Sequence, residues 1–538
     1  MLFQERTFSK AGRYFYNQSG VLLINTSGCR IPDLDPFHAS VSKFFQTNVS
    51  IQSCSPPIVS LQEEYDGYGI HRRRRRNFHL NATTLINSQW WWIWTTCCVR
   101  KIKINSDQVD IKMDSDPTCT EIPLDLNGLS IDENDETQFV RVECGATFFG
   151  VRINFYNDSF ALVPSPRVLL PVKSKFWADQ KNQSYHQPPS VLIIGIDSIS
   201  RLNMIRSLPK TKAFLESNDF IEMRGHMKIG LNTFPNMMAA LTGMTETEVV
   251  SCWPTSTAKL VNCPFVWTNF SRLNYITAMV EDSSDFGTFN FLKTGFIASP
   301  TDYYLHPLLI TERQTTSGGS DNCLGGGLTT TRLLLRYISA IVDPVGGVAP
   351  LFLLSWFTSV VHDDLNGLKL YDSKFHSFLD NIISSRVGRD AIIFFISNHG
   401  NSFGPFRQTF HGQYEDSLPF FFLRLPVSLK ARFPEWHSSV ETNSARLTTP
   451  FDIYASLAHL LNMIDPSLAS SPRTARRGHS FFKSDTPENR TCESASIPGE
   501  FCVCNIFPDS SASSHLADKL GHLVPEKINA HLAENSLR

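Results

Sequence analysis

The stretch QPPSVLIIGIDSISR, residues 187–201, decides the fold, because an apolar run ends abruptly at the carboxylate Asp197. A short continuous apolar run bounded by turn residues is typical of a strand that is buried on both faces. The segment AIIFFISNHG, residues 391–400, has the same form and ends at Asn398 and His399. The segment LNTFPNMMAALTG, residues 231–243, places Thr233 just before a proline and an apolar helical stretch. These segments favour one shared site.

Apolar strands alternate with helical stretches throughout residues 189–485. This alternation predicts an α/β domain with a mostly parallel sheet covered by helices on both faces. In such sheets ligands bind beyond the carboxyl ends of the strands. Residues 1–188 have short apolar runs separated by turns, which predict a β-rich, cysteine-containing N-terminal domain. Residues 486–538 are predicted to form a C-terminal tail with cysteines and a short helix.

The composition is that of an ordinary globular chain, and 538 residues favour two or three domains. The formal net charge of −2 provides no general attraction to nucleic acid. The basic run Arg72–Arg76 could be a nuclear signal, a polyanion patch or a protease site, but we favour a solvated or disordered insert. The aromatic cluster SQWWWIW, residues 88–94, is expected to be buried in the N-terminal domain, although it could stack on sugar rings or sit at a membrane interface.

Cysteines and glycosylation sequons both favour the secretory route. The chain has 12 cysteines, most of them in its first third and its tail, which is typical of disulfide-stapled secreted proteins. The beginning MLFQERTFSK lacks the apolar core of a signal peptide, so we expect either a missing leader or a cytosolic protein with idle sequons, and we favour the first. No stretch reaches the ~18 apolar residues of a membrane span. Eight sequons are predicted glycosylation sites: Asn17, Asn25, Asn48, Asn81, Asn157, Asn182, Asn269 and Asn489.

The strand-end residues are suited to metal-assisted chemistry on an anionic ester. Divalent cations take carboxylate and imidazole ligands, which Asp197 and His399 can supply. Thr233 can act as a nucleophile that a cation activates, and the start of a helix favours a bound anion. Each residue also has a plain structural interpretation: Asp197 or Thr233 as a helix cap, and His399 as a turn residue.

The same motifs resemble those of the alkaline phosphatase superfamily, in which the last motif usually reads S-D-H-G. More of the chain resembles a sulfatase-like branch, the animal proteins grouped as domain of unknown function two-two-nine. The matching segments are CRIPDLDPFHASVSKF, VHDDLNGLKLYD, SNHGNSFGPFRQTFHGQYEDSLPFF and RTCESASIPGEFCVCN, which span residues 29 to 504. The resemblance implies an alkaline-phosphatase-like fold that is usually extracellular, with no established substrate.

Carried over residue by residue, the resemblance implies a metal site of Asp197, Thr233, Asn398 and His399. It implies that Thr233 is the nucleophile and that His362 faces the substrate. The D-x-x-G-H pair of two-zinc phosphodiesterases is not evident, so we expect one divalent metal ion, zinc or manganese, with calcium as a third option. Asp363 or Asp364 could instead hold a second ion. Three residues after the S-N-H-G turn are expected to contact the anion: Arg407, His411 and Glu415.

Two departures from the family pattern decide the chemistry that we expect. Asn398 replaces a carboxylate by a neutral amide, which removes a negative charge and should weaken both cation binding and activation of Thr233. The sulfatase segment C/S-x-P-x-R reads T-F-P-N-M here, so sulfate-ester hydrolysis by the usual aldehyde route is disfavoured.

Two hypotheses remain open from the sequence. The chain is a metal-dependent phosphoester hydrolase or transferase with Thr233 as nucleophile, acting on an anionic ester. Alternatively, it is a catalytically degenerate extracellular binding or structural protein on the same fold. An intracellular protein with a polybasic signal is a third, weaker interpretation. No nucleic-acid partner and no membrane span are expected, and the substrate, disulfide pairing and oligomeric state stay open.

Overall fold

The computed structural model describes most of the chain between residues 21 and 529. The described residues are 21–46, 49, 54, 56–66, 73–81, 95–107, 110–115, 118–123, 128–132, 134–182, 187–258, 260, 263–284, 286–315, 323–324, 327–362, 364–468, 477–483, 486–505, 523, 526–527 and 529. The SQWWWIW cluster, the sequons at Asn17 and Asn48, and most of the expected tail helix lie outside these residues.

A seven-stranded sheet forms the centre of the molecule, in the order β12-β20-β19-β11-β18-β14-β15. Its pairings from β19 through β15 are parallel, whereas β20 runs antiparallel to both β19 and β12. The prediction of a mostly parallel sheet is therefore confirmed, with an antiparallel edge. The strands are β11 (Ser190–Ile196), β12 (Phe220–Glu222), β14 (Ile276–Glu281), β15 (Tyr303–Tyr304), β18 (Leu351–Phe357), β19 (Ala391–Ile396) and β20 (Phe421–Arg424).

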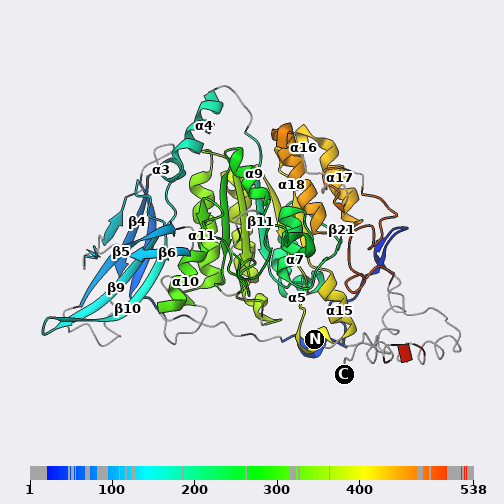
Figure 1. Cartoon of the computed structure of the whole chain (residues 1–538), viewed down its shortest axis with the longest axis horizontal. Coiled ribbons are helices and arrows are strands. Elements are labelled where there is room, and N and C mark those ends of the chain that lie inside the picture. Colours follow the sequence, from blue (N-terminus) through cyan, green and yellow to red (C-terminus); the bar gives the residue numbers. More distant parts are fainter. Residues whose placement is uncertain are drawn as a thin grey trace.

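Helices cover both faces of this sheet (Figure 1), as the sequence predicts. Along β11 the side chains alternate between two hydrophobic cores, Leu192 in one and Val191 in the other. The Leu192 core is completed by α5 (Arg201–Ser207), α6 (Pro209–Ser217), α11 (Thr330–Val345) and α12 (Asp372–Ser384). The Val191 core is completed by α7 (Thr233–Thr242), α9 (Val266–Arg272), α16 (Val427–Arg432), α17 (Pro434–Ser444) and α18 (Pro450–Ile464).

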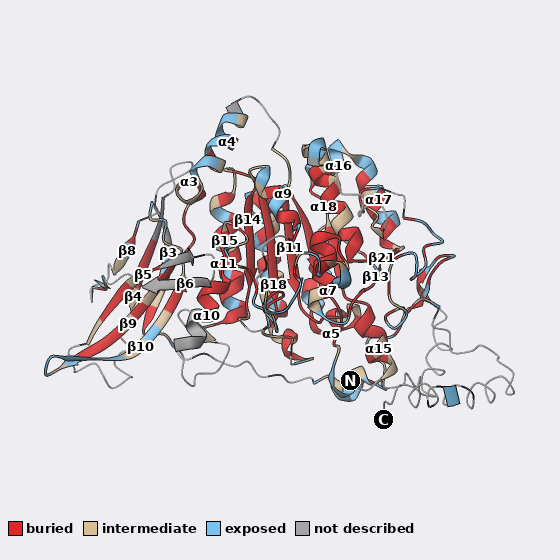
Figure 2. Ribbon diagram, in the orientation of Figure 1, coloured by how far each residue is buried: buried red, intermediate tan, exposed pale blue. Residues whose placement is uncertain are grey.

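The three middle strands are buried along their whole length (Figure 2). This burial explains why their sequences are continuous apolar runs rather than alternating ones. Gly195 in β11 allows the close packing, because a Cβ atom there would lie 1.9 Å from the ring of Trp356 on β18. The close packing of these strands fixes the positions of their carboxyl ends, and with them the positions of Asp197 and Asn398 relative to each other.

The N-terminal region is a β-sandwich, which confirms its β-rich character. One layer is the sheet β3-β4-β8 and the other is β10-β9-β5-β6 with β7 paired to β5. The two layers share a core that includes Val59, Phe78, Val142 and Phe160. The strands are β3 (Val59–Asp66), β4 (Arg73–Leu80), β5 (Thr95–Asp107), β6 (Asp110–Ser115), β7 (Thr120–Glu121), β8 (Leu129–Ile131), β9 (Phe139–Phe148) and β10 (Val151–Ala161).

The last arginine of the basic run is not solvated as we favoured, whereas Arg72 lies outside the described residues. Residues 73–80 form β4, between β3 and β8, and Arg76 is buried. Arg76 donates from Nη2 to the carbonyl of Asp132, 2.5 Å away. β4 pairs with β3 along its whole length and with β8 from Arg76 to Phe78, so strand pairing outweighs the charge of the sequence here.

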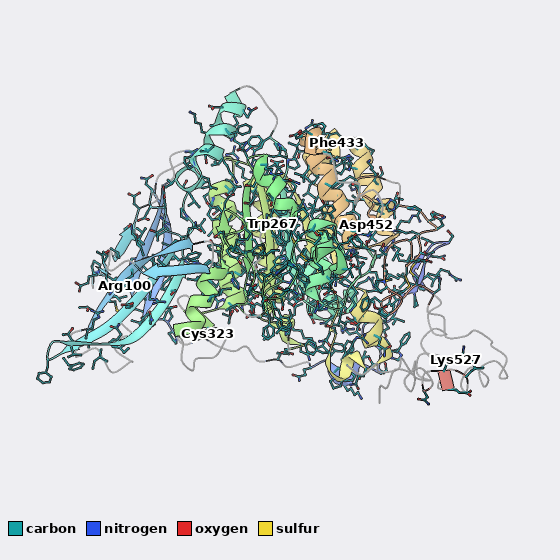
Figure 3. All side chains as sticks on the ribbon, viewed as in Figure 1. Arg100, Trp267, Cys323, Phe433, Asp452 and Lys527 are labelled. Carbon is teal, nitrogen blue, oxygen red and sulfur yellow. A yellow bond between two sulfur atoms is a disulfide. The ribbon has the colours of Figure 1, made fainter. Side chains whose placement is uncertain are left out.

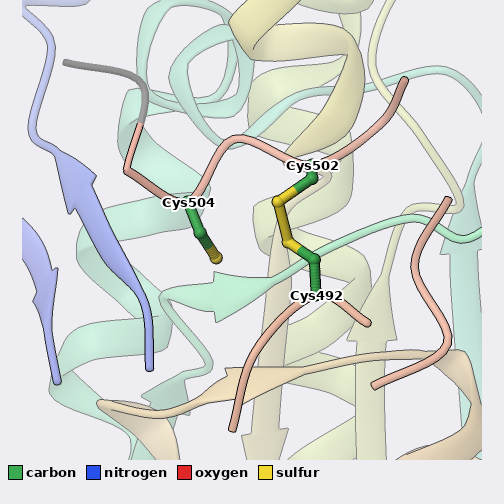
Figure 4. Close-up of side chains that lie close together, drawn as sticks. All are labelled: Cys492, Cys502 and Cys504. Carbon is green, nitrogen blue, oxygen red and sulfur yellow. A yellow bond between two sulfur atoms is a disulfide. The ribbon is translucent and has the colours of Figure 1, made fainter. Parts of the chain in front are cut away.

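Six disulfides use all 12 cysteines: Cys29–Cys504, Cys54–Cys323, Cys97–Cys144, Cys98–Cys119, Cys252–Cys263 and Cys492–Cys502. Cys323, labelled in Figure 3, ties the central region to Cys54 of the N-terminal region. Cys492, Cys502 and Cys504 lie close together (Figure 4), but their sulfur atoms are held in disulfides and offer no thiolate to a metal. Six disulfides indicate folding in an oxidising, secretory-type compartment.

Among the described residues, no helix is both long and apolar enough to span a bilayer. The remaining helices and strands are β1 (Leu22–Asn25), β2 (Arg30–Pro32), α3 (Pro166–Leu169), α4 (Pro171–Asn182), β13 (Gly225–His226), α8 (Glu246–Val249), α10 (His306–Thr315), β16 (Cys323–Leu324), β17 (Leu328–Thr329), α13 (Arg386–Arg389), α14 (Gly404–Arg407), α15 (Phe410–Ser417) and β21 (Leu447–Thr448).

Candidate functional site

Asp197 is the centre of the candidate site. It directly follows β11, and its backbone N–H donates to the carbonyl of Phe357 at 2.9 Å, which continues the strand pairing up to the carboxylate. Its side chain is buried. The next residue, Ser198, has φ +56°, a left-handed conformation that is strained for a residue other than glycine. Such strain often marks a functional turn, and here it directs the chain from the strand end towards α5.

Thr233 reaches Asp197 from the first turn of α7. Its Oγ donates a hydrogen bond to Asp197 Oδ1 at 3.0 Å, and the residue is half-buried. The preceding loop is fixed by Asn236, whose Oδ1 accepts from the backbone N–H groups of Ile229 and Gly230 at 2.8 and 3.2 Å. The local sequence therefore holds the threonine hydroxyl against the carboxylate.

The orientation of the Asn398 amide is determined by its neighbours. Its Oδ1 accepts from the backbone N–H groups of Ser198 and His399, at 3.1 and 3.0 Å. Its Nδ2 must then face the other way, and it donates to Asp197 Oδ1 at 2.7 Å. The opposite orientation would set the amide N–H groups against two backbone N–H donors. Asn398 consequently presents a donor, and not an oxygen, to Asp197.

His399 directs an unprotonated ring nitrogen, Nε2, towards the Asp197 carboxylate. Its Nδ1 donates to the carbonyl of Gly400 at 2.6 Å, and this bond assigns the lone pair to Nε2. Nε2 is buried 3.9 Å from Asp197 Oδ1, and no group in the described part of the chain hydrogen-bonds to it. Burial lowers the pKa of His399, although the charge of Asp197 opposes this. The imidazole is therefore favoured in its neutral, ligand-competent form.

The residues present fit a divalent cation in part. The orphaned Nε2 of His399 and the carboxylate of Asp197 are the ligand types that zinc and manganese take, and the Thr233 hydroxyl can add a third oxygen. Asn398 in its observed orientation does not fit, because its amide hydrogens point at Asp197. The four residues that the sequence assigns to a metal site do converge, but Asn398 directs an N–H donor, and not an oxygen ligand, towards Asp197.

Two acidic residues at the end of β14 lie near this centre. Glu281 is buried, and burial together with the charges of Asp282 and Asp197 raises its pKa to about 7. Its Oε1 accepts from the N–H of Thr288 at 2.7 Å, while Oε2 has no partner among the described residues. Burial also raises the pKa of Asp282. The sequence places both at a strand end but gives no sign of the unpaired oxygen, which depends on burial.

His362 lies in the loop that follows β18. Its ring stacks on that of Phe286, with the centroids 4.3 Å apart, and the residue is half-buried. It thus belongs to the carboxyl edge of the sheet, where a substrate-facing role was expected. That role remains a prediction.

The three expected anion contacts have protein partners. Arg407 donates from Nε to Asp416 at 2.7 Å, and Glu415 is buried in an ion pair with Arg206. His411 is buried and stacks on His38. These contacts give the side chains structural roles in α14 and α15, and their predicted contact with an anion gains no support.

The described sequons differ in accessibility. Asn25, Asn157 and Asn489 are exposed, and Asn81 and Asn269 are half-buried. Asn182 ends α4, but its side chain is not among those described. Glycosylation at these positions stays a prediction.

A family model described as "Protein of unknown function (DUF229)" matches residues 48–538. No curated protein matches the chain. Among solved structures, a 2-O GAG sulfatase matches with 12% identity and TM-score 0.36, covering 57% of this chain and 76% of its own. Phosphonate monoester hydrolase from Silicibacter pomeroyi matches with 12% identity and TM-score 0.35, over 53% and 76%. The lipoteichoic acid synthase LtaP from Listeria monocytogenes matches with 11% identity and TM-score 0.33, over 45% and 66%.

Proposed function

This chain belongs to the DUF229 family, and from that premise we propose that it is a metal-dependent phosphoester hydrolase or transferase with Thr233 as its nucleophile. One observation carries the proposal: the Thr233 hydroxyl, the free Nε2 of His399 and the amide of Asn398 all meet at Asp197 Oδ1. A nucleophile, an acceptor for its proton and an unpaired ligand nitrogen are the parts that displacement at phosphorus needs.

The residues of the chain have distinct roles in this reaction. Thr233 Oγ attacks phosphorus, and its proton passes along the existing 3.0 Å hydrogen bond to Asp197 Oδ1. The bond from phosphorus to the leaving oxygen breaks, and that oxygen takes a proton from His362. Water, or an acceptor hydroxyl in a transferase, then attacks phosphorus and gives its proton to His362. The bond from phosphorus to Thr233 Oγ breaks, and that oxygen takes its proton back from Asp197, which restores the starting state.

Asp197, His399 and Thr233 would hold the cation, which we take to be zinc or manganese, with calcium as a third option. When bound, it supplies positive charge that lowers the pKa of a coordinated hydroxyl and stabilises a phosphoryl oxygen. Because a threonine stands where sulfatases need cysteine or serine, phosphoesters are the better substrates.

The test is hydrolysis of p-nitrophenyl phosphate by the purified chain loaded with manganese or zinc. Thr233→Ala should abolish turnover, whereas Thr442→Ala, an exposed threonine on α17, should leave it unchanged. Activity that survives Thr233→Ala would remove the nucleophile assignment.

The orientation of Asn398 favours a second candidate, a degenerate extracellular binding protein on the same fold. Asn398 Nδ2 lies 2.7 Å from Asp197 Oδ1, and its N–H already offsets the negative charge of Asp197. An aspartate in place of Asn398 would require a cation or a proton between the two carboxylates. Metal analysis of the folded chain discriminates between the two. One tightly bound equivalent supports the enzyme, and an inert parent that gains metal and turnover through Asn398→Asp supports the degenerate protein.

A further inference from the structure

Exposed aromatic side chains gather at the carboxyl edge of the sheet. The described residues include six exposed phenylalanines: Phe37, Phe149, Phe176, Phe286, Phe291 and Phe403. The last three, with exposed fractions of 38%, 41% and 43%, lie in the loops after β14 and β19, which also lead away from the candidate site. Large exposed apolar groups that cluster usually mark an interaction site.

These side chains form one continuous ring surface with His362. Phe286 stacks on His362 at 4.3 Å and on Phe291 at 5.4 Å between centroids, with interplanar angles of 28° and 30°. The ring centroid of Phe403 lies 5.7 Å from that of His362. We call Phe286, Phe291, His362 and Phe403 the aromatic rim. It joins three loops that are far apart in the sequence.

The loop that carries Phe286 and Phe291 also contacts the residue after Thr233. Lys293 follows Phe291 by two residues, and its Nζ lies 4.2 Å from the ring centroid of Phe234, the residue after Thr233. The same loop is anchored at Glu281, which accepts the N–H of Thr288 at 2.7 Å. One loop therefore carries two rim residues and the ammonium group of Lys293, which contacts the start of α7.

We propose that the aromatic rim binds the organic group of the ester and that this group carries a flat aromatic ring. The inference rests on the proposed function, because it places the anionic end of the ligand at Thr233. Aromatic rings stack on aromatic faces in offset or edge-to-face arrangements that add to simple burial. The positive charge of Lys293, which lies over the ring of Phe234 in the same loop as Phe286 and Phe291, complements an anionic aryl ester.

The experiment measures binding by calorimetry, using the full chain carrying Thr233→Ala so that no turnover occurs. The probes are naphthyl phosphate, methyl phosphate and naphthol, each with manganese present. Naphthyl phosphate should bind about tenfold more tightly than methyl phosphate, the gain expected from stacking and burying a ring. Adding Phe286→Ala and Phe403→Ala should remove this gain, whereas adding Phe149→Ala, an exposed phenylalanine at the β9–β10 hairpin tip, should keep it.

The probes separate the inference from the proposed function. Equal binding of naphthyl and methyl phosphate, both tighter than naphthol, would overturn the role of the rim and leave the anion site standing. Equal binding of naphthyl phosphate and naphthol, lost in the rim variant, would support ring binding and overturn the anion site.

Two more probes test other occupants of the rim. A hexose phosphate that binds more tightly than naphthyl phosphate would show a sugar subsite and overturn the inference. Binding to phosphatidylglycerol vesicles that is lost in the rim variant, with no preference for naphthyl phosphate, would show a membrane contact and also overturn it.

Discussion

Asn398→Asp should convert a hydrogen bond into a repulsion that a divalent cation relieves. The Asn398 amide nitrogen lies 2.7 Å from Asp197 Oδ1. An oxygen in its place would bring two carboxylates together, and two unit charges at that distance repel by about 6 kcal/mol at an effective dielectric constant of about 20. Relaxation and proton uptake reduce this, so we expect a loss of about 3–5 kcal/mol, the usual effect of an uncompensated buried charge.

The assay is thermal unfolding in a chelator and in manganese or zinc. An unfolding entropy of about 2.1 cal/mol/K per residue, over the roughly 300 residues of the α/β unit, converts this loss into about 5–8 °C. The variant should lose this much in the chelator and recover it when the cation is added, because a cation between two carboxylates replaces the lost amide hydrogen.

Asn443→Asp is the matched control for this experiment. Asn443 is buried and donates from Nδ2 to the carbonyls of Phe481 and Lys483, at 3.2 and 2.7 Å. Its conversion to a carboxylate should also destabilise the fold, but among the described residues no carboxylate is hydrogen-bonded to Asn443, so none is there to share a cation. The reasoning is refuted if the cation raises the midpoint of Asn398→Asp no more than that of the parent, or if the variant is fully stable in the chelator.

Three further perturbations probe the fold around the site. In the folded state Glu281 keeps its proton up to about pH 7, whereas in the unfolded chain it loses the proton near pH 4.5. The free energy of unfolding should therefore fall by about 3 kcal/mol as the pH rises from 4.5 to about 7. Urea unfolding of Glu281→Gln should lack this part of the pH dependence. Gly195→Ala should destabilise the sheet by about 1–3 kcal/mol or more, measured by denaturant unfolding, because its Cβ would overlap the ring of Trp356, and an unchanged midpoint would contradict this packing. Replacing both Cys252 and Cys263 by alanine should lower the unfolding free energy by about 3 kcal/mol, since their 11-residue separation closes a short loop, and no loss would contradict a native disulfide there.

The sequence predicts the parts of the fold that depend on burial alone. The apolar runs at 190–196, 351–357 and 391–396 are typical of strands covered on both faces, and the structure has them as such strands. Parallel strands then bring their carboxyl ends to one edge, which is why Asp197 and His399 could be expected to meet. The domain boundaries that we placed at residues 188 and 485 remain predictions.

What the sequence could not predict depends on contacts between segments far apart in the chain. The direction of the Asn398 amide is set by the N–H of Ser198, on another strand end. Glu415 follows the S-N-H-G motif closely, yet its partner Arg206 lies 209 residues earlier in the chain. A motif therefore identifies which residues arrive at a site, whereas the neighbours decide which atom each one presents.

The disulfide between Cys29 and Cys504 closes nearly the whole chain into a covalent ring. A protease that cuts any bond between these two cysteines leaves both fragments tethered. Nicked material will therefore keep its full mass and run as a single species on a non-reducing gel. Cleavage in a surface loop becomes visible only after the sample is reduced, so a single band on a non-reducing gel does not show that the backbone is uncut.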